Sequence, residues 1–248
     1  MRAFVIAWHF LTAVPLSGRV HDPEPRELAA SMAWYPVVGL ALGGIVAGVD
    51  WVLTLWLSQA VVGVLLLLLL VGLTRGLHQD GLADTVDGLA GGRTPAARLA
   101  IMRDGRIGAV GATALCLILL VRAVGLDEFV PPDRQALLLC LPLVGRWMMV
   151  ATAYGSTYAR AEEGLASPFL AHLTGRHVLS ATLWAALPLY WFLGIVGGTT
   201  VLLGGAGLAW AIRRFCRRQF GGLTGDMLGA TNEVAEALFV LAGPVLVA

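Results

Sequence analysis

The chain has 248 residues, of which 58% are hydrophobic and 13% charged, and its formal net charge is +1. Soluble domains usually carry about 25% charged residues, so this composition excludes an ordinary water-soluble fold and requires lipid to cover part of the surface. A net charge near zero gives no support for a nucleic-acid partner held by bulk electrostatics. The cysteines Cys116, Cys140 and Cys216 form no CxxC pair, which argues against a disulfide framework or a structural zinc site.

The first predicted element is a short apolar segment at residues 1–17, which carries Arg2 and ends near Pro15. It is shorter than the roughly 20 apolar residues that a membrane span needs. No convincing small-x-small cleavage site follows it, so a signal peptide is the weaker interpretation. We expect an interfacial or re-entrant helix here.

Long apolar segments follow along the rest of the chain, and the last two are short for spans. The candidate spans are residues 33–56, 61–77, 107–125, 136–154, 178–196, 199–212 and 234–247. They predict an all-α, polytopic integral membrane helical bundle with about six to seven transmembrane helices and an N-terminal interfacial helix. We expect residues 1–248 to form a single transmembrane catalytic domain.

Arginine placement predicts the orientation of the bundle, because cytoplasmic loops carry an excess of basic residues. If residues 1–32 are cytoplasmic, the arginine-rich segments lie on the same side: residues 78–106, 157–177 and 213–226. The opposite connections hold few arginines: residues 58–60, 126–135 and 197–198. This predicts a multi-pass protein of the cell (inner) membrane with its polar motifs on the cytoplasmic side.

The most informative motif follows the second candidate span and contains Asp80, Asp84 and Asp87. Their i, i+4, i+7 spacing places three carboxylates on one helical face, since each residue turns the helix by about 100°. Such close carboxylates repel unless protons or a cation neutralise them, and oxygen ligands favour Mg²⁺, Mn²⁺ or Ca²⁺. A solvated acidic face is the alternative, but acids beside a membrane span are costly and are functional by default. His78 points elsewhere on this helix and is a weaker candidate.

Arginines follow these acids at Arg93, Arg98, Arg103 and Arg106, with Asp104 between the last two. Metal-binding carboxylates beside guanidinium groups indicate a phosphate or diphosphate substrate. The positive-inside rule explains the number of arginines equally well, although it does not explain Asp104.

A second acidic motif contains Asp226 and Glu233, whose i, i+7 spacing puts them on one helical face, with Asn232 beside them. Asp226 has helix capping as its alternative role. Glu236, three residues further on, is interpreted as a marker of the membrane interface.

Arg146 lies inside the fourth candidate span. An arginine at that depth costs several kcal/mol unless it is paired, so we expect it to face the bundle interior. There it would pair with an acid or contact substrate phosphate, and snorkelling to the surface is the alternative.

Together these motifs resemble those of the cobalamin synthase (adenosylcobinamide-GDP ribazoletransferase) family. The resemblance rests on residues 78–88, 98–108 and 222–230 with Glu233, and the length and hydrophobic profile fit over the whole chain. One departure is Gly105, where many family members have serine, which puts in doubt any hydroxyl contribution there.

The resemblance implies that a ribose hydroxyl of alpha-ribazole, or of its 5′-phosphate, attacks the phosphorus attached to adenosylcobinamide in adenosylcobinamide-GDP and releases GMP. Mg²⁺ is the implied cofactor. The expected catalytic residues are Asp80, Asp84, Asp87, Asp104 and Asp226. The expected metal ligands are Asp80, Asp84, Asp87, Asp226 and Glu233. The expected phosphate-binding residues are Arg98, Arg103, Arg106 and Arg146, with His78, Arg93 and Asn232 as further candidates.

Two other functions stay open at this point. A CDP-alcohol phosphotransferase also uses aspartates, glycines and an arginine, but its pattern needs a later aspartate pair, and Asp104 stands alone. A cation-coupled transporter would use the acids as ion sites, although such proteins often show internal repeats and mid-membrane acids. The sequence leaves open the preferred ribazole form, the number of metal ions and the oligomeric state, a homo-oligomer included.

Overall fold

The computed structural model describes residues 1–16, 22–162 and 164–247, and in these ranges every regular element is a helix. The one extended pairing there is an isolated bridge between Tyr158 and Leu223. The all-α prediction is therefore confirmed.

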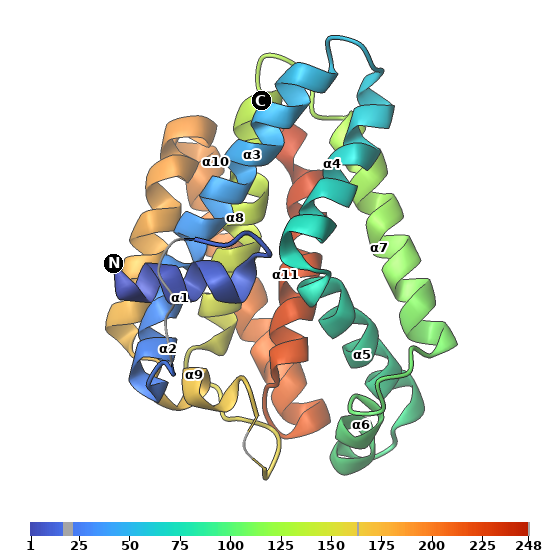
Figure 1. Cartoon of the computed structure of the whole chain (residues 1–248), viewed down its shortest axis with the longest axis vertical. Helices are drawn as coiled ribbons and strands as arrows, with labels where there is room; N and C mark the ends of the chain where they lie inside the picture. Colours follow the sequence, from blue (N-terminus) through green and yellow to red (C-terminus); the bar gives the residue numbers. More distant parts are fainter. Residues whose placement is uncertain (17–21, 163, 248) are drawn as a thin grey trace.

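Long upright helices build the bundle, and they correspond to the predicted spans (Figure 1). These helices are α3 (Tyr35–Leu53), α4 (Gln59–Thr74), α7 (Ala109–Asp127), α8 (Arg134–Ala153), α10 (Gly175–Phe220) and α11 (Gly225–Leu246). The other elements are α1 (Arg2–Leu11), α2 (Pro25–Ser31), the 3₁₀ helix η1 (Met32–Trp34), α5 (Leu77–Gly91), α6 (Pro95–Ile101) and α9 (Ser167–His172).

Fewer helices qualify as spans by length and hydropathy than the six to seven predicted. Among the described residues, four helical segments qualify, or five if the bent pair of α4 and α5 counts as one span. One reason is that α10 contains two of the predicted spans within 46 residues. The other is that α11, which carries several acids, is not among the four.

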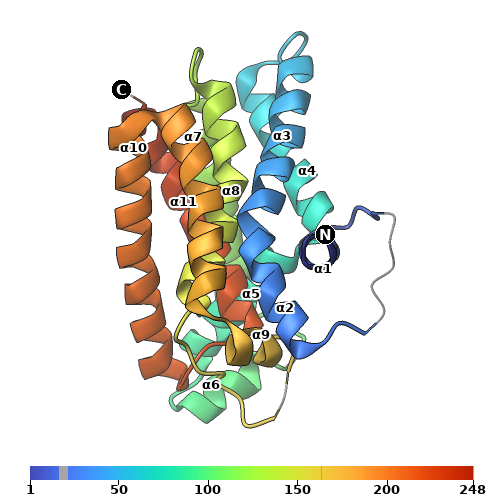
Figure 2. The same ribbon diagram turned by 90° about the vertical axis from the view of Figure 1, so that its left-hand side faces the viewer.

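Helix α10 reverses direction at Gly194, whose φ of 68° and ψ of −178° are not helical. A straight helix of this length would measure about 70 Å, more than twice the roughly 30 Å hydrocarbon core of a bilayer. Figure 2 shows its two halves running side by side. The prediction placed this connection at residues 197–198, but the turn falls slightly earlier, at a glycine that accepts a positive φ without steric cost. Gly197 and Gly198 instead pack closely, against Leu246 and Tyr190.

Helix α8 forms the centre of the bundle and packs most extensively against α3. A Cβ added at Gly39 of α3 would lie 2.5 Å from the carbonyl oxygen of Pro142 on α8. Small residues therefore let these two backbones approach closely, as is usual where membrane helices pack.

The N-terminal helix α1 lies across the upright helices and is seen end-on in Figure 2. Its ten residues are too few to span a membrane. Ile6, Ala7 and Leu11 are buried against the bundle. This orientation fits the predicted interfacial helix; residue 17 of the predicted segment lies outside the described residues.

The chain bends by 90° between α4 and α5. Arg75 and Gly76 make this bend with positive φ values of 55° and 66°. Helix α5 is thereby directed to the end of the bundle that also holds α6 and α9 (Figure 1). The three arginine-rich segments meet at this same end, where Arg98 contacts Gln219 and Arg103 contacts Glu162.

Candidate active site

The site is built where α5 crosses α11, and glycines let the two helices touch. A Cβ added at Gly81 of α5 would lie 2.5 Å from the carbonyl oxygen of Asp226 on α11. A Cβ added at Gly229 of α11 would lie 3.2 Å from the Cα of His78 on α5. This close contact brings the first acids of α5 beside the first turn of α11.

The crossing brings three acidic residues close together: Asp80, Asp84 and Asp226. Asp84 lies within electrostatic range of both other acids and of Arg160. Asp80 and Asp84 line a cavity of about 690 Å³. Asp80 and Asp226 line a second cavity of about 210 Å³. Asp80 therefore borders both cavities.

Asp226 lies in the first turn of α11 but does not cap it. Thr224 is the N-cap, and its hydroxyl accepts a 3.4 Å hydrogen bond from the backbone N–H of Met227. The Oδ2 atom of Asp226 accepts hydrogen bonds from the Thr224 hydroxyl at 3.2 Å and from the Arg160 guanidinium at 3.1 Å. The capping interpretation is thus wrong for Asp226, which is free to face the cavity.

Arg160 is a site residue that the sequence analysis did not single out. Its loop is fixed to the start of α11 by two backbone hydrogen bonds of 2.9 Å, from Ala159 N–H to the Leu223 carbonyl and from Leu223 N–H to the Thr157 carbonyl. No spacing in the sequence reveals this bridge, because the two segments are far apart in the chain.

Asp87 is engaged elsewhere. Its two carboxylate oxygens accept 2.7 Å hydrogen bonds from the backbone N–H groups of Gly108 and Gly111, at the start of α7. A carboxylate satisfies unpaired N–H groups and complements the helix dipole at such a position. Asp87 therefore fixes α7 to α5, and the structure does not direct it to the shared cavities.

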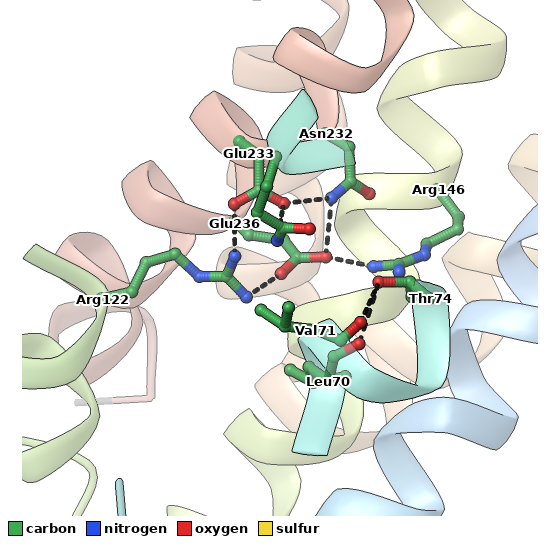
Figure 3. A network of polar contacts seen from close by, with 9 residues as sticks. Leu70, Val71, Thr74, Arg122, Arg146, Asn232, Glu233 and Glu236 are labelled. Carbon is green, nitrogen blue, oxygen red and sulfur yellow. Dashed lines mark hydrogen bonds and ion pairs between the residues drawn. The ribbon is translucent and has the colours of Figure 1, made fainter. Parts of the chain in front are cut away.

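Glu233 belongs to a buried network of charges in the bundle interior (Figure 3). Arg122 of α7 donates a 2.6 Å hydrogen bond to Glu233 and also forms an ion pair with Glu236. Arg146 of α8 forms an ion pair with Glu236. All four side chains are at most 2% exposed.

Two amide side chains complete this network, and one of them, from Gln79, links it to α5. Asn232 donates to both glutamates, and Gln79 donates a 2.9 Å hydrogen bond to Glu233. The structure therefore engages Glu233 and Asn232 within this network, and it pairs Arg146 with an acid rather than aiming it at a phosphate site. The interpretation of Glu236 as an interface marker is wrong, since the network encloses it. Arg122 was missed, although a charged residue inside an apolar run was the available signal.

The remaining arginines lie around the cavities with different roles. Arg98 donates to the carbonyl oxygens of Gly92 and Gln219, so it fastens α6 to the end of α10. Arg103 lines the larger cavity and forms a 3.0 Å ion pair with Glu162. Arg93 is exposed.

Arg106 and Asp104 form an exposed ion pair of 2.6 Å. The hydrogen bonds from the Arg106 guanidinium lower the pKa of the Asp104 carboxyl. The structure therefore pairs these two residues with each other and leaves Asp104 outside the group of acids at the crossing.

A family model described as cobalamin-5-phosphate synthase matches residues 3–243. The chain belongs to this family. Relatives named adenosylcobinamide-GDP ribazoletransferase include those of Syntrophobacter fumaroxidans (42% identical over 88% of both chains), Desulforamulus reducens (37% identical over 93% of this chain and 91% of the relative) and Klebsiella pneumoniae (34% identical over 98% and 99%). No solved structure matches the chain.

Membership of the cobalamin-5-phosphate synthase family confirms the resemblance drawn from the motifs. The aspartates and glycines of these motifs lie in residues 78–88 and 222–230, and these two segments meet at the α5–α11 crossing. Neither the CDP-alcohol phosphotransferase nor the transporter interpretation gains support from the match.

The carboxylates at the α5–α11 crossing supply the oxygen ligands that Mg²⁺ prefers. Among the described residues, no three Asp, Glu, His or Cys side chains lie close enough together to hold a metal. Mg²⁺ needs fewer, because it usually binds one or two carboxylates together with water and substrate phosphates. The oxygens of Asp80 and Asp84 and the Oδ1 atom of Asp226 fit this pattern, whereas Oδ2 of Asp226 and the oxygens of Asp87 and Glu233 already accept hydrogen bonds.

Proposed function

We propose that this protein transfers the adenosylcobinamide-phosphate moiety of adenosylcobinamide-GDP to alpha-ribazole, or to alpha-ribazole 5′-phosphate, and releases GMP. The observation that carries the proposal is the family match over residues 3–243. Its geometric support is the pair of cavities that meet at Asp80, because a transfer between two substrates needs two adjoining sites.

In the proposed reaction, the ribose hydroxyl oxygen of the acceptor attacks the phosphorus that bears adenosylcobinamide. A new P–O bond forms, the P–O bond to GMP breaks, and GMP leaves with the bonding electrons. We assign the hydroxyl proton to Oδ1 of Asp226, because both side-chain hydrogen bonds to this carboxylate fall on Oδ2. Arg160 holds that carboxylate in place.

Asp80 and Asp84 are the residues we propose to hold Mg²⁺, since both line the larger cavity. The ion would offset negative charge on the diphosphate and on departing GMP. Arg103 lines the same cavity and would contact the diphosphate oxygens. Asp226, which the sequence analysis expected to bind the metal, is assigned here the role of proton acceptor.

The apolar helices make this a membrane protein. We propose that it lies in the inner membrane with the α5–α11 crossing on the cytoplasmic side. The support is that the arginine-rich segments predicted to be cytoplasmic gather at the end of the bundle that holds this crossing.

The test is turnover by purified protein reconstituted in lipid. Adenosylcobinamide-GDP and either ribazole form are supplied with Mg²⁺ or with EDTA, and GMP and the corrin product are followed by chromatography. We expect product that requires the metal and disappears in Asp84→Ala. Asp127→Asn, at the exposed end of α7, is the matched control and should retain activity. A folded wild-type protein that forms no product with either acceptor would overturn the proposal.

A further inference from the structure

A third cavity, of about 350 Å³, lies at the end of α10 and shares no lining residue with the two cavities at the α5–α11 crossing. We call it the basic cavity, because α10 contributes four arginines to its lining: Arg213, Arg214, Arg217 and Arg218. Their i, i+1, i+4, i+5 spacing puts them on one side of the helix. None of the described residues that line this cavity is acidic.

Within the described part of the chain, no acid pairs with these four guanidinium groups. Arg213 donates to the carbonyl oxygen of Tyr154, and Arg214 lies 5.9 Å from the centre of the Trp210 ring. The positive-inside rule accounts for basic residues at this end of the bundle, but it does not require them to surround one cavity. Like charges gathered in this way repel one another, so an anion bound among them is favoured.

An apolar groove of about 360 Å³ continues from the basic cavity, since Trp210 and Arg213 line both. The groove lies between α8 and the two halves of α10, which run side by side (Figure 2). Its lining is mostly apolar and includes Trp147, Ala151, Val178, Leu202 and Leu203. Leu203 is 69% exposed, so the groove opens on a surface that faces lipid.

The place of the basic cavity along α10 matches the depth of lipid phosphate groups. At about 1.5 Å per residue, Trp210 lies roughly 24 Å along the helix from the turn at Gly194, and Arg217 roughly 34 Å. Because the hydrocarbon core of a bilayer is about 30 Å thick, α10 crosses it between the turn and the arginines. An exposed tryptophan at this level is typical of the headgroup region.

We propose that the basic cavity and the apolar groove together bind one anionic phospholipid, with its phosphate among the arginines and an acyl chain in the groove. A soluble phosphate would use the basic cavity alone and leave the adjoining groove unexplained. A phospholipid with an ammonium headgroup is disfavoured, because the cavity lining offers that group no acid. This inference goes beyond the proposed function and does not depend on the transfer reaction.

The test titrates the detergent-solubilised protein with phosphatidylglycerol or with phosphatidylcholine and follows bound lipid by native mass spectrometry. We expect the wild-type protein to bind phosphatidylglycerol about 30-fold more tightly than phosphatidylcholine. Arg217→Gln/Arg218→Gln should remove most of this preference, since each arginine contributes roughly fivefold. Equal binding of the two lipids by the wild-type protein would overturn the proposal.

Arg93→Gln/Arg176→Gln is the matched control, because it removes the same charge from two exposed arginines outside the basic cavity. It should keep the full preference. Equal losses in the two double variants would mean that the lipid responds only to net charge, and would sink the site. Thermal unfolding in detergent checks that both variants fold. If the first does not, Arg214→Gln, at an exposed position, replaces it and should lower the preference about fivefold.

A second pair of variants separates a lipid from a soluble anion. Ala206→Phe fills the apolar groove, whereas Gly207→Phe adds the same ring at the next residue, which does not line the groove and has open space around its added Cβ. We expect only Ala206→Phe to weaken phosphatidylglycerol binding, by about tenfold. Inorganic phosphate should not displace the lipid from the wild-type protein. Full lipid affinity in Ala206→Phe, or displacement by inorganic phosphate, would point to a soluble-anion site and overturn the lipid assignment.

Discussion

The guanidinium of Arg160 donates a 3.1 Å hydrogen bond to the carboxylate of Asp226, 66 residues further along the chain. The backbone bridge between Tyr158 and Leu223 brings the two segments together. Arg160 thereby orients one oxygen of Asp226, and in the proposed reaction the other oxygen receives the proton of the acceptor hydroxyl.

Arg160→Ala should therefore lower kcat/KM for transfer by about 10- to 100-fold, because a charge-assisted hydrogen bond to a reacting carboxylate is lost. GMP release by reconstituted protein measures this effect. Arg160→Lys should retain part of the activity, and Arg176→Ala, an exposed arginine at the start of α10, should retain all of it. Full activity in Arg160→Ala would contradict the role assigned to this residue.

Substitutions of Asp87 and Asp84, which lie on the same helix, should have different effects, the first on stability and the second on turnover. Asp87→Ala leaves two N–H groups of α7 without their acceptor, so it should lower the free energy of unfolding by about 0.5–2 kcal/mol. Asp84→Ala should abolish turnover and leave the Tm unchanged. Thermal unfolding in detergent and GMP release, measured on both variants, check the pair. The reverse pattern would show that Asp87 is the metal ligand.

Gly81→Ala should weaken the contact between α5 and α11, because its methyl group would lie 2.5 Å from a backbone oxygen of Asp226. We expect loss of both stability and activity, although alanine favours a helix by up to about 1 kcal/mol over glycine. Gly72→Ala, in α4, is the matched control, since nothing lies within 4 Å of its added Cβ. Equal Tm values for the two variants would mean that the helices have room to separate.

Glu236→Ala should be among the most damaging single changes, because it removes the acid that pairs with Arg146 and leaves Arg122 with Glu233 alone in the bundle interior. Breaking a buried ion pair from one side typically costs about 3–5 kcal/mol. Chemical unfolding of the reconstituted protein should show this loss, whereas Glu128→Ala, at an exposed position, should change stability little. A Glu236→Ala protein as stable as the wild type would refute the structural role of the network.

The helical positions and the shared helical face of Asp80 and Asp84 could be predicted, because apolar length and helical spacing are local properties of the sequence. That Asp226 joins them from another helix was an expectation from the family resemblance. The groups that pair with each charged side chain could not be predicted from the sequence. Asp87 occupies the same helical face as the other two acids, yet the N–H groups of α7 bind it. Only the packing of α7 against α5 decides this.

Charged residues inside the spans also show that the sequence does not predict which residues form ion pairs. Asp50 lies in the first predicted span, and Arg134 was assigned to an outer loop beside other acids. The structure joins them through hydrogen bonds from the Arg134 guanidinium to both Asp50 oxygens. The cost of an unpaired charge in lipid signals that Asp50 has a partner, but which of the chain's arginines it takes depends on how α3 meets α8.

The buried network also constrains how the chain enters the membrane. Arg122 and Arg146 lie in α7 and α8, whereas both glutamates that neutralise them lie in α11, which is synthesised later. An unpaired arginine in the centre of a helix disfavours insertion by about 2.5–3.5 kcal/mol. Arg146 lies near the middle of α8, whereas Arg122 lies closer to the end of α7. Helices α7 and α8 thus remain poorly accommodated by lipid until α11 arrives. A nascent chain that stops before α11 would lack Asp226 and would also expose unneutralised arginines, which makes it a substrate for membrane quality control.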